Sequence, residues 1–125
     1  VFEGLAFAIV DALQGYPQGG ELYLTGGGAA SATWLQIIAD CTGRTVVSSA
    51  FNELSARGAA ILAARSVAAL AETPPLAQTR YQPRPQAHAR YAALYPVYRL
   101  LREQMLPVWQ ARQAALQPLS QDLQP

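Results

Sequence analysis

Residues 22–40 read LYLTGGGAASATWLQIIAD, and this stretch decides the fold. A short run of alternating, β-favouring residues leads into three consecutive glycines, and a helical pattern starts directly after them. Glycine has no Cβ, so a flat ligand can lie against bare main chain at such a junction. The free amides at the start of the following helix carry partial positive charge, which suits the polar groups of a nucleotide. A tight turn that binds nothing is the alternative interpretation of the glycines alone.

Periodicities on either side of this stretch predict further elements. The expected elements are, in order, a helix over 1–14, a strand over 21–25, a helix over 31–42 that ends at Gly43, a strand over 45–49 and a helix from Asn52 or Glu53 to about Ala71. This alternation of helices and strands predicts an α/β fold. Two strands make a poor sheet on their own, and a helix-covered sheet buries both faces, so we expect this piece to lack neighbouring elements.

The rest of the chain divides at a proline-rich segment. Residues 73–85 hold four prolines and predict an extended connector rather than a packed element. Helical spacing returns over 86–113, with a kink or interruption expected at Pro96 and Pro107. The expected divisions are therefore residues 1–72, the connector 73–85, and a C-terminal helix and tail over 86–125.

Two of the expected helices carry a stripe of related side chains. Small residues imply very close packing of the helix that follows residue 52, and they are Ala56, Gly58, Ala59, Ala60, Ala63 and Ala64. Aromatic residues at the spacing of a buried helix face follow the connector, and they are Tyr91, Tyr95, Tyr98 and Trp109. We favour core packing for this aromatic stripe over stacking on a sugar or filling a partner's groove.

Composition excludes several classes of function. The net charge is +1, so nothing indicates nucleic acid or an acidic membrane surface as a partner. All nine basic residues are arginine, which excludes a P-loop lysine and Schiff-base chemistry in this chain. Cys41 is the single cysteine, so no internal disulfide is possible and a reducing, cytoplasmic setting is the default. We expect Cys41 to be a buried thiol. No run reaches the roughly 18–20 apolar residues of a membrane span. The start without Met or a signal peptide fits a chain cut from a longer protein.

The glycine stretch resembles the C-terminal part of the FGGY carbohydrate kinases, the family of the xylulokinases, ribulokinases and glycerol kinases. The motif runs Gly-Gly-Gly-Ala-x-Ser-x-x-Trp-x-Gln-Ile-x-Ala-Asp from Gly26 to Asp40. Gly43 and then Glu-x-x-Ala-x-Gly-Ala-Ala from Glu53 follow it. The opening helix and the closing aromatic helix also resemble the family, in its order and spacing, over about residues 1–100.

This resemblance implies a fold and a function for the complete protein. The fold would be part of a ribonuclease-H-like domain, as in actin and the sugar kinases, followed by a C-terminal helical extension. The protein would be an ATP-dependent carbohydrate kinase that phosphorylates a hydroxyl of a small sugar or polyol, with Mg²⁺ held mainly outside this chain. The alternatives are an actin-like ATPase with a non-sugar substrate and a non-enzymatic, truncated interaction module. We expect no nucleic acid and no membrane as partners, and a homodimer is left open.

The resemblance also implies site residues. Gly26, Gly27, Gly28 and Ala29 would form a floor against adenine and ribose. Ser31 would cap the helix or bond the ligand directly, and the two roles are compatible. The catalytic aspartate, the sugar-binding residues and the phosphate-binding loops of the family lie upstream of this segment. We therefore assign no catalytic residue and no metal ligand here, and expect this chain alone to be inactive.

For four other residues, a structural role is weighed against a functional one. Core packing is favoured for Trp34 over stacking on a ligand. Asp40 lies at the far end of its helix from the glycines, so we expect it to be solvated or paired with Arg44 rather than a catalytic acid. Glu53 is expected to complement the helix dipole in the first turn, with a nucleotide contact as the alternative. His88 has no partner at metal-ligand spacing, so no zinc site is expected.

Overall fold

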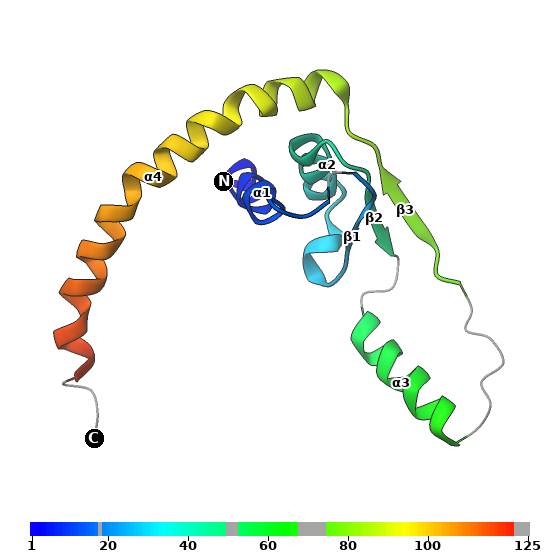
Figure 1. Cartoon of the computed structure of the whole chain (residues 1–125). Helices are drawn as coiled ribbons and strands as arrows, with labels where there is room; N and C mark the ends of the chain where they lie inside the picture. Colours follow the sequence, from blue (N-terminus) through cyan, green and yellow to red (C-terminus); the bar gives the residue numbers. More distant parts are fainter. Residues whose placement is uncertain (18, 50–52, 68–74, 122–125) are drawn as a thin grey trace. The chain divides into compact units, whose positions relative to one another are not determined.

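The computed structural model describes residues 1–17, 19–49, 53–67 and 75–121. Its elements are, in chain order, α1 (Phe2–Ala12), β1 (Leu22–Leu24), the short 3₁₀ helix η1 (Gly27–Ala30), α2 (Ala32–Thr42), β2 (Val46–Ser49), α3 (Leu54–Val67), β3 (Gln78–Tyr81) and α4 (Pro85–Gln121) (Figure 1). They fall into two units, Val1–Tyr91 and Ala92–Pro125. The α/β class expected from the sequence is confirmed.

A three-stranded sheet in the order β1-β2-β3 forms the centre of the first unit. β1 and β2 run parallel, with Leu22 opposite Val46, and α2 is the crossover between them. β3 pairs antiparallel with β2, with Tyr81 opposite Val46. This third strand corrects the sequence-based prediction, which placed only an extended connector there. The prolines of that segment flank the paired residues 78–81 and leave their amides free to bond, so they do not prevent a strand.

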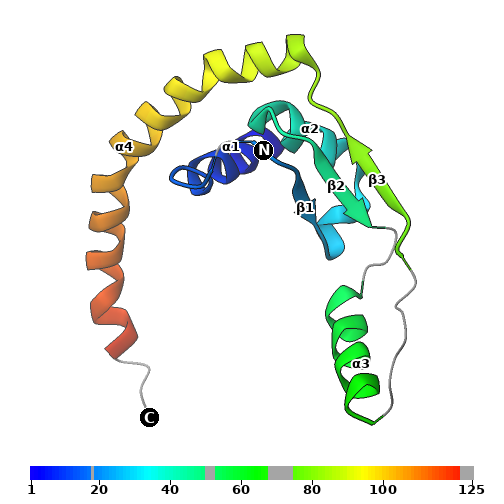
Figure 2. The ribbon, with the colours of Figure 1, turned by 45° about the vertical axis from the view of Figure 1, so that its right-hand side comes forward.

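The core lies between α2 and the sheet, and α1 packs beside α2 (Figure 2). Leu35, Ile38 and Ala39 recur on one face of α2 and are buried with Val46 of β2. Partly buried residues of the neighbouring elements pack against this cluster, and they are Ile9, Leu22, Leu24, Ala29, Trp34 and Tyr81. The core therefore fixes α2 on the sheet directly after the glycine-rich turn.

The ends of α2 lie where the sequence placed them. Ser31 caps its first turn, because the Ser31 hydroxyl oxygen accepts the Trp34 amide at 3.3 Å. Gly43 ends the helix in the left-handed conformation with φ of 67°. A helix start and a helix stop thus confirm the predicted helix over 31–42.

α3 contributes no buried side chain among its described residues. Leu62 and Val67 are 69% and 85% exposed. The close packing expected of its small residues is therefore not made within the described part of the chain. Glu53 lies just before the helix rather than in its first turn, and its carbonyl accepts the Arg57 amide at 3.0 Å. The expected ends at Asn52 and Ala71 fall outside the described residues.

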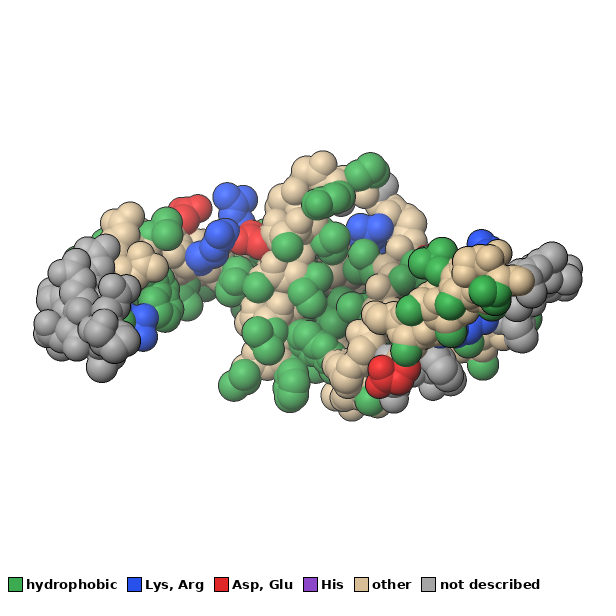
Figure 3. Space-filling view, turned by 90° about the horizontal axis from the view of Figure 1, so that it is seen from below, with side chains coloured by type: hydrophobic (Ala, Val, Ile, Leu, Met, Phe, Trp, Pro, Cys, Tyr) green, Lys and Arg blue, Asp and Glu red, His purple; other side chains and the backbone are tan. Residues whose placement is uncertain are grey.

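α4 is continuous over 37 residues, so Pro96 and Pro107 do not interrupt it. Within the second unit, the Tyr95 and Tyr98 rings stack with centroids 6.3 Å apart, and Trp109 is 54% exposed. Among the described residues of that unit, Trp109 therefore does not make the core packing expected of the aromatic stripe, whereas Tyr95 and Tyr98 are half-buried. In the view of Figure 3, hydrophobic side chains reach the surface over much of the face shown.

Candidate functional site

The glycine-rich turn begins where β1 ends. Gly26 has φ of 84° and ψ of −172°, a backbone conformation that is essentially restricted to glycine. This residue turns the chain from the strand into η1, and the Ala29 amide donates to the Gly26 carbonyl at 2.9 Å. Gly26 is therefore required by the geometry of the turn, whether or not a ligand lies against it.

Gly27 and Gly28 need a different explanation, because neither has a positive φ. A Cβ built on Gly27 would meet nothing within 4 Å, and one on Gly28 would meet the Trp34 Nε1 at an ordinary 3.8 Å. Both glycines are exposed. Neither backbone strain nor packing within the described chain demands glycine at these positions. The turn thus presents two residues of open main chain to whatever lies outside it.

Ser31 joins this turn to α2. It is exposed, and its oxygen is engaged as the helix cap, so the capping role expected from the sequence is confirmed. Its hydroxyl hydrogen is a further donor that a ligand beside the helix start could use. Cap and ligand contact are therefore compatible in this geometry.

Ser48 holds the turn in place and was not identified from the sequence. Its hydroxyl donates to the Ala29 carbonyl at 3.3 Å, and Ser48 is 6% exposed. The bond ties the end of β2 to η1. The available signal was a small hydroxyl residue at the carboxyl end of the second predicted strand, which the fold places beside the first.

The position of the turn in the sheet matters for function. It follows the carboxyl end of β1, next to the carboxyl end of the parallel strand β2. In open α/β sheets, ligands bind outside the carboxyl ends of the strands. The arrangement can offer exposed main chain, a helix start and one hydroxyl, which are groups for binding rather than for acid–base catalysis.

Trp34 lies next to this turn and is half-buried against the core cluster. Its ring is tilted on Phe2, with centroids 5.5 Å apart. This packing confirms the core role that the sequence favoured.

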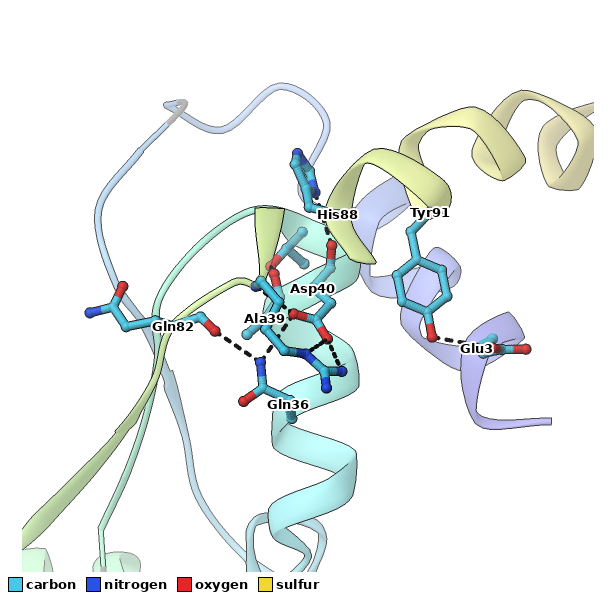
Figure 4. A network of polar contacts seen from close by, with 9 residues as sticks. Glu3, Gln36, Ala39, Asp40, Gln82, His88 and Tyr91 are labelled. Atoms are coloured by element: carbon cyan, nitrogen blue, oxygen red, sulfur yellow. Dashed lines mark hydrogen bonds and ion pairs between the residues drawn. The ribbon is translucent and has the colours of Figure 1, made fainter. Parts of the chain in front are cut away.

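Asp40 corrects a sequence-based prediction. It is fully buried rather than solvated, and its partner is Arg84 rather than Arg44 (Figure 4). The Asp40 carboxylate accepts the Arg84 backbone amide at 2.7 Å, the Arg84 Nε at 3.0 Å and the Gln36 Nε2 at 3.0 Å. Burial alone would raise the pKa of this carboxyl, but the hydrogen bonds from Arg84 and Gln36 lower it below its usual value. Arg44 instead donates its Nε to the Gly20 carbonyl at 3.2 Å.

His88 belongs to the same cluster. Its Nδ1 lies 2.9 Å from the Asp40 carbonyl oxygen (Figure 4), and its ring covers Gly43 closely. A Cβ on Gly43 would come within 2.6 Å of the His88 Cε1. Within the described residues, no three His, Cys, Asp or Glu side chains gather as a metal site. The contacts of His88 thus fix the start of α4 on the end of α2.

Glu3 and Tyr91 add a second link in the first unit. The Tyr91 hydroxyl donates to the Glu3 carboxylate at 3.1 Å (Figure 4). The Tyr91 ring also lies edge-on to Phe7, with the ring centroids 6.0 Å apart. Cys41 is a buried free thiol, as expected. Among the described helices, none is long and apolar enough to cross a bilayer.

The fold and the turn define a class: an α/β unit with an open glycine-rich turn at the carboxyl ends of parallel strands. Residues 1–67 match the FGGY family of carbohydrate kinases, C-terminal domain. This match covers more than half of the chain, so the chain belongs to the FGGY family and contains its C-terminal domain.

Individual relatives agree with the family. The chain is 31% identical over 106 residues to a probable L-xylulose kinase of Pasteurella multocida, covering 81% of this chain and 22% of that protein. A xylulose kinase structure from Rhodospirillum rubrum aligns with a TM-score of 0.66 at 27% identity, covering 87% of this chain and 24% of that one. A ligand-bound xylulose kinase from Lactobacillus acidophilus has a TM-score of 0.73 at 22% identity, covering 84% and 23%, and supports the fold alone. The chain thus spans about a quarter of the length of these relatives.

Proposed function

We propose that this chain is the adenosine-side segment of an ATP-dependent carbohydrate kinase. The complete enzyme would transfer the γ-phosphoryl group of ATP to a hydroxyl of a small sugar or polyol. The family match and the relatives named as xylulose kinases support this assignment. In this proposal the domain has the ribonuclease-H-like architecture of the superfamily, and residues 1–72 form the part nearest the nucleotide.

The observation that carries the proposal is the open main chain of Gly27 and Gly28. Nothing in the described chain requires the absence of a side chain at Gly27, yet three glycines stand in a row. A flat base lying against the turn would require it, because a side chain would occupy the space of the base. Gly26, Gly27, Gly28 and Ala29 would form this floor, and the Ser31 hydroxyl would donate to the nucleotide.

In this proposal, the groups that carry out catalysis and hold the phosphates lie in other parts of the complete protein. No residue of this chain is proposed as the catalytic base, and Mg²⁺ and the phosphates would be held mainly by the preceding part of the protein. The chain alone would therefore not phosphorylate a sugar. Cytoplasmic location follows from the same proposal, since ATP and phosphorylated sugars are kept inside cells.

Substitutions of increasing size at Gly27 in the complete enzyme test whether this turn forms the floor of the nucleotide site. Gly27→Ala and then Gly27→Val should raise the KM for ATP stepwise, because each adds volume where the base would lie. The KM for the sugar should change little. The thermal midpoint should stay within a few degrees of wild type, because a Cβ at Gly27 meets nothing within 4 Å among the described residues. An ATP KM that does not change in Gly27→Val would remove this turn from the nucleotide site.

A matched control separates the backbone role from the ligand role. Gly26→Ala places a side chain on a residue whose φ is 84°, so it should lower the free energy of unfolding by about 1–3 kcal/mol. Gly27→Ala should cost less than about 1 kcal/mol. Nucleotide specificity is checked by titrating ADP against GDP, with ADP expected to bind more tightly.

A further inference from the structure

Trp34 carries a hydrogen-bond donor that its packing does not use. The ring is half-buried against Phe2 and the core cluster, but its Nε1 makes no hydrogen bond to any residue that the structure describes. Among these same residues, every enclosed side-chain nitrogen and oxygen has a partner. The unpaired Nε1 is therefore not enclosed, and its N–H reaches the surface while the ring is packed. An indole N–H normally finds an acceptor, so this one is available to a ligand.

The N–H edge of Trp34 faces the glycine-rich turn. A Cβ built on Gly28 would lie 3.8 Å from Nε1, and no other atom of Trp34 would come within 4 Å of it. The donor nitrogen is thus the part of the indole that borders the space of the missing side chain. Gly28 has no positive φ, so its own backbone does not demand glycine. The missing side chain leaves the approach to Nε1 open.

A base that lies against this turn would bring an acceptor to that donor. A flat ligand in contact with the bare Cα of Gly28 occupies the space that a side chain would fill, and Nε1 borders this space. The turn contacts the face of the base, so a donor at the side of the turn meets the edge of the base. The edge of a purine carries ring nitrogens, which accept hydrogen bonds.

We propose that the Trp34 Nε1–H donates a hydrogen bond to a ring nitrogen of the nucleotide's base, and that Gly28 is glycine because a side chain there would cover this donor. The inference rests on the proposed function, since it takes the turn as the floor of the nucleotide site. Trp34 has two compatible roles, because its ring packs against Phe2 and the core while its N–H orients the base.

The affinity of the complete enzyme for ADP, measured by calorimetry, tests the donor. Trp34→Phe keeps an aromatic ring for packing but removes the N–H, so the Kd for ADP should rise about three- to tenfold, as for the loss of one hydrogen bond. An unchanged Kd would overturn the proposal. The thermal midpoint of the variant is measured alongside, so that a loss of folding is not mistaken for a loss of affinity.

Two control variants separate the donor from the packing. Phe2→Leu removes the ring partner of Trp34 but leaves the N–H, and should keep the Kd for ADP within about twofold of wild type. Trp109→Phe makes the same replacement at the other tryptophan of this chain and should leave the Kd unchanged. A weakening in Phe2→Leu as large as that in Trp34→Phe would assign the effect to packing and would overturn the proposal.

Analogues of ADP identify the acceptor without any change to the protein. In 1-deaza-, 3-deaza- and 7-deaza-ADP, a C–H group replaces one ring nitrogen of adenine. One of them should bind the wild-type enzyme about three- to tenfold more weakly than ADP, whereas Trp34→Phe should bind that analogue and ADP about equally. If Trp34→Phe discriminates against each analogue as wild type does, the N–H does not meet a base nitrogen and the proposal is overturned.

Gly28→Ala tests the reason for the glycine and leaves Trp34 in place. The added methyl would lie against Nε1, so the Kd for ADP should rise. The same substitution should cost less affinity in the Trp34→Phe background, where no donor is left to cover. Equal costs in the two backgrounds would overturn the role given to Gly28.

Binding of ADP to the unsubstituted complete enzyme separates this inference from the proposed function. Absence of saturable ADP binding would refute the proposed function and this inference with it. Saturable binding that Gly27→Val weakens, with a Kd that Trp34→Phe leaves unchanged, would refute the inference alone and leave the turn as the floor of the nucleotide site.

Discussion

Arg84 holds the carboxylate of Asp40 with its backbone amide and its guanidinium, although Asp40 is fully buried and 44 residues distant in the chain. Gln36 completes the set from within α2 and also donates to the Gln82 carbonyl at 2.8 Å. These bonds attach the segment between β3 and α4 to the last turns of α2. A buried carboxylate is tolerated only when it is paired in this way.

Arg84→Ala should lower the free energy of unfolding by about 1–3 kcal/mol, because it leaves a buried carboxylate with fewer donors. The value stays below that of a fully buried pair, since the Arg84 side chain is itself 65% exposed and screened by water. Arg44→Ala is the matched control and should cost less than about 1 kcal/mol. Equal losses in urea denaturation of the two variants would contradict the assignment of Arg84 as the partner.

The same pair predicts a dependence of stability on pH. The pKa of Asp40 is lowered in the folded protein, so its contribution is fully present above the unfolded pKa of about 3.9. The contribution is lost as the pH falls through the still lower folded pKa. The difference in unfolding free energy between wild type and Asp40→Asn should therefore shrink below about pH 4. A difference that stays constant from pH 7 to pH 2 would show that ionised Asp40 is not stabilised by folding.

Gly43 should tolerate no side chain. Gly43→Ala places a Cβ on a residue with φ of 67° and within 2.6 Å of the His88 ring, which is held by the Asp40 carbonyl. The left-handed conformation alone costs about 1–2 kcal/mol, and the clash adds to this. Gly43→Ala should therefore lower the free energy of unfolding less in a His88→Ala background than in the wild-type protein. Equal costs in thermal or urea unfolding would mean that the ring moves away freely.

Cys41 should be inert in the folded protein. Burial, with smaller contributions from the charges of Asp40 and Glu3, raises the pKa of its thiol to about 12. Only the thiolate reacts, so alkylation by iodoacetamide at pH 8 should be at least about a hundredfold slower than in urea-unfolded protein. The comparison is made on the same sample before and after unfolding. Similar rates in the two states would place the thiol at the surface.

The local features of the site could be predicted from the sequence. The strand before the glycines, the Ser31 cap, the helix over 31–42 and the stop at Gly43 all depend on residues within one or two turns of each other. Capping, left-handed glycine and apolar periodicity are therefore readable without a fold. The glycine motif also carried the family resemblance, which the match over residues 1–67 confirms.

Contacts between segments far apart in the sequence are either not predicted or predicted wrongly. The four prolines of residues 73–85 predict a connector there, whereas the pairing of residues 78–81 with β2 is decided by the sheet. The partner of Asp40 was sought next to it in sequence, at Arg44, because nothing in the local pattern brings Arg84 close. Ser48 was overlooked for the same reason, since its bond to Ala29 exists only when two strands lie parallel.

The sequence by itself determined the glycine-rich turn, the helix that follows it and the family, because these reside in short-range patterns of backbone freedom and hydrogen-bond capping. The tertiary structure alone decided which glycines are demanded by backbone geometry and which stay open. It also decided that Asp40 is buried and ionised, and that Trp109 of the aromatic stripe is 54% exposed. Burial and pairing depend on distances between residues far apart in the chain, and those distances are fixed only when the elements pack.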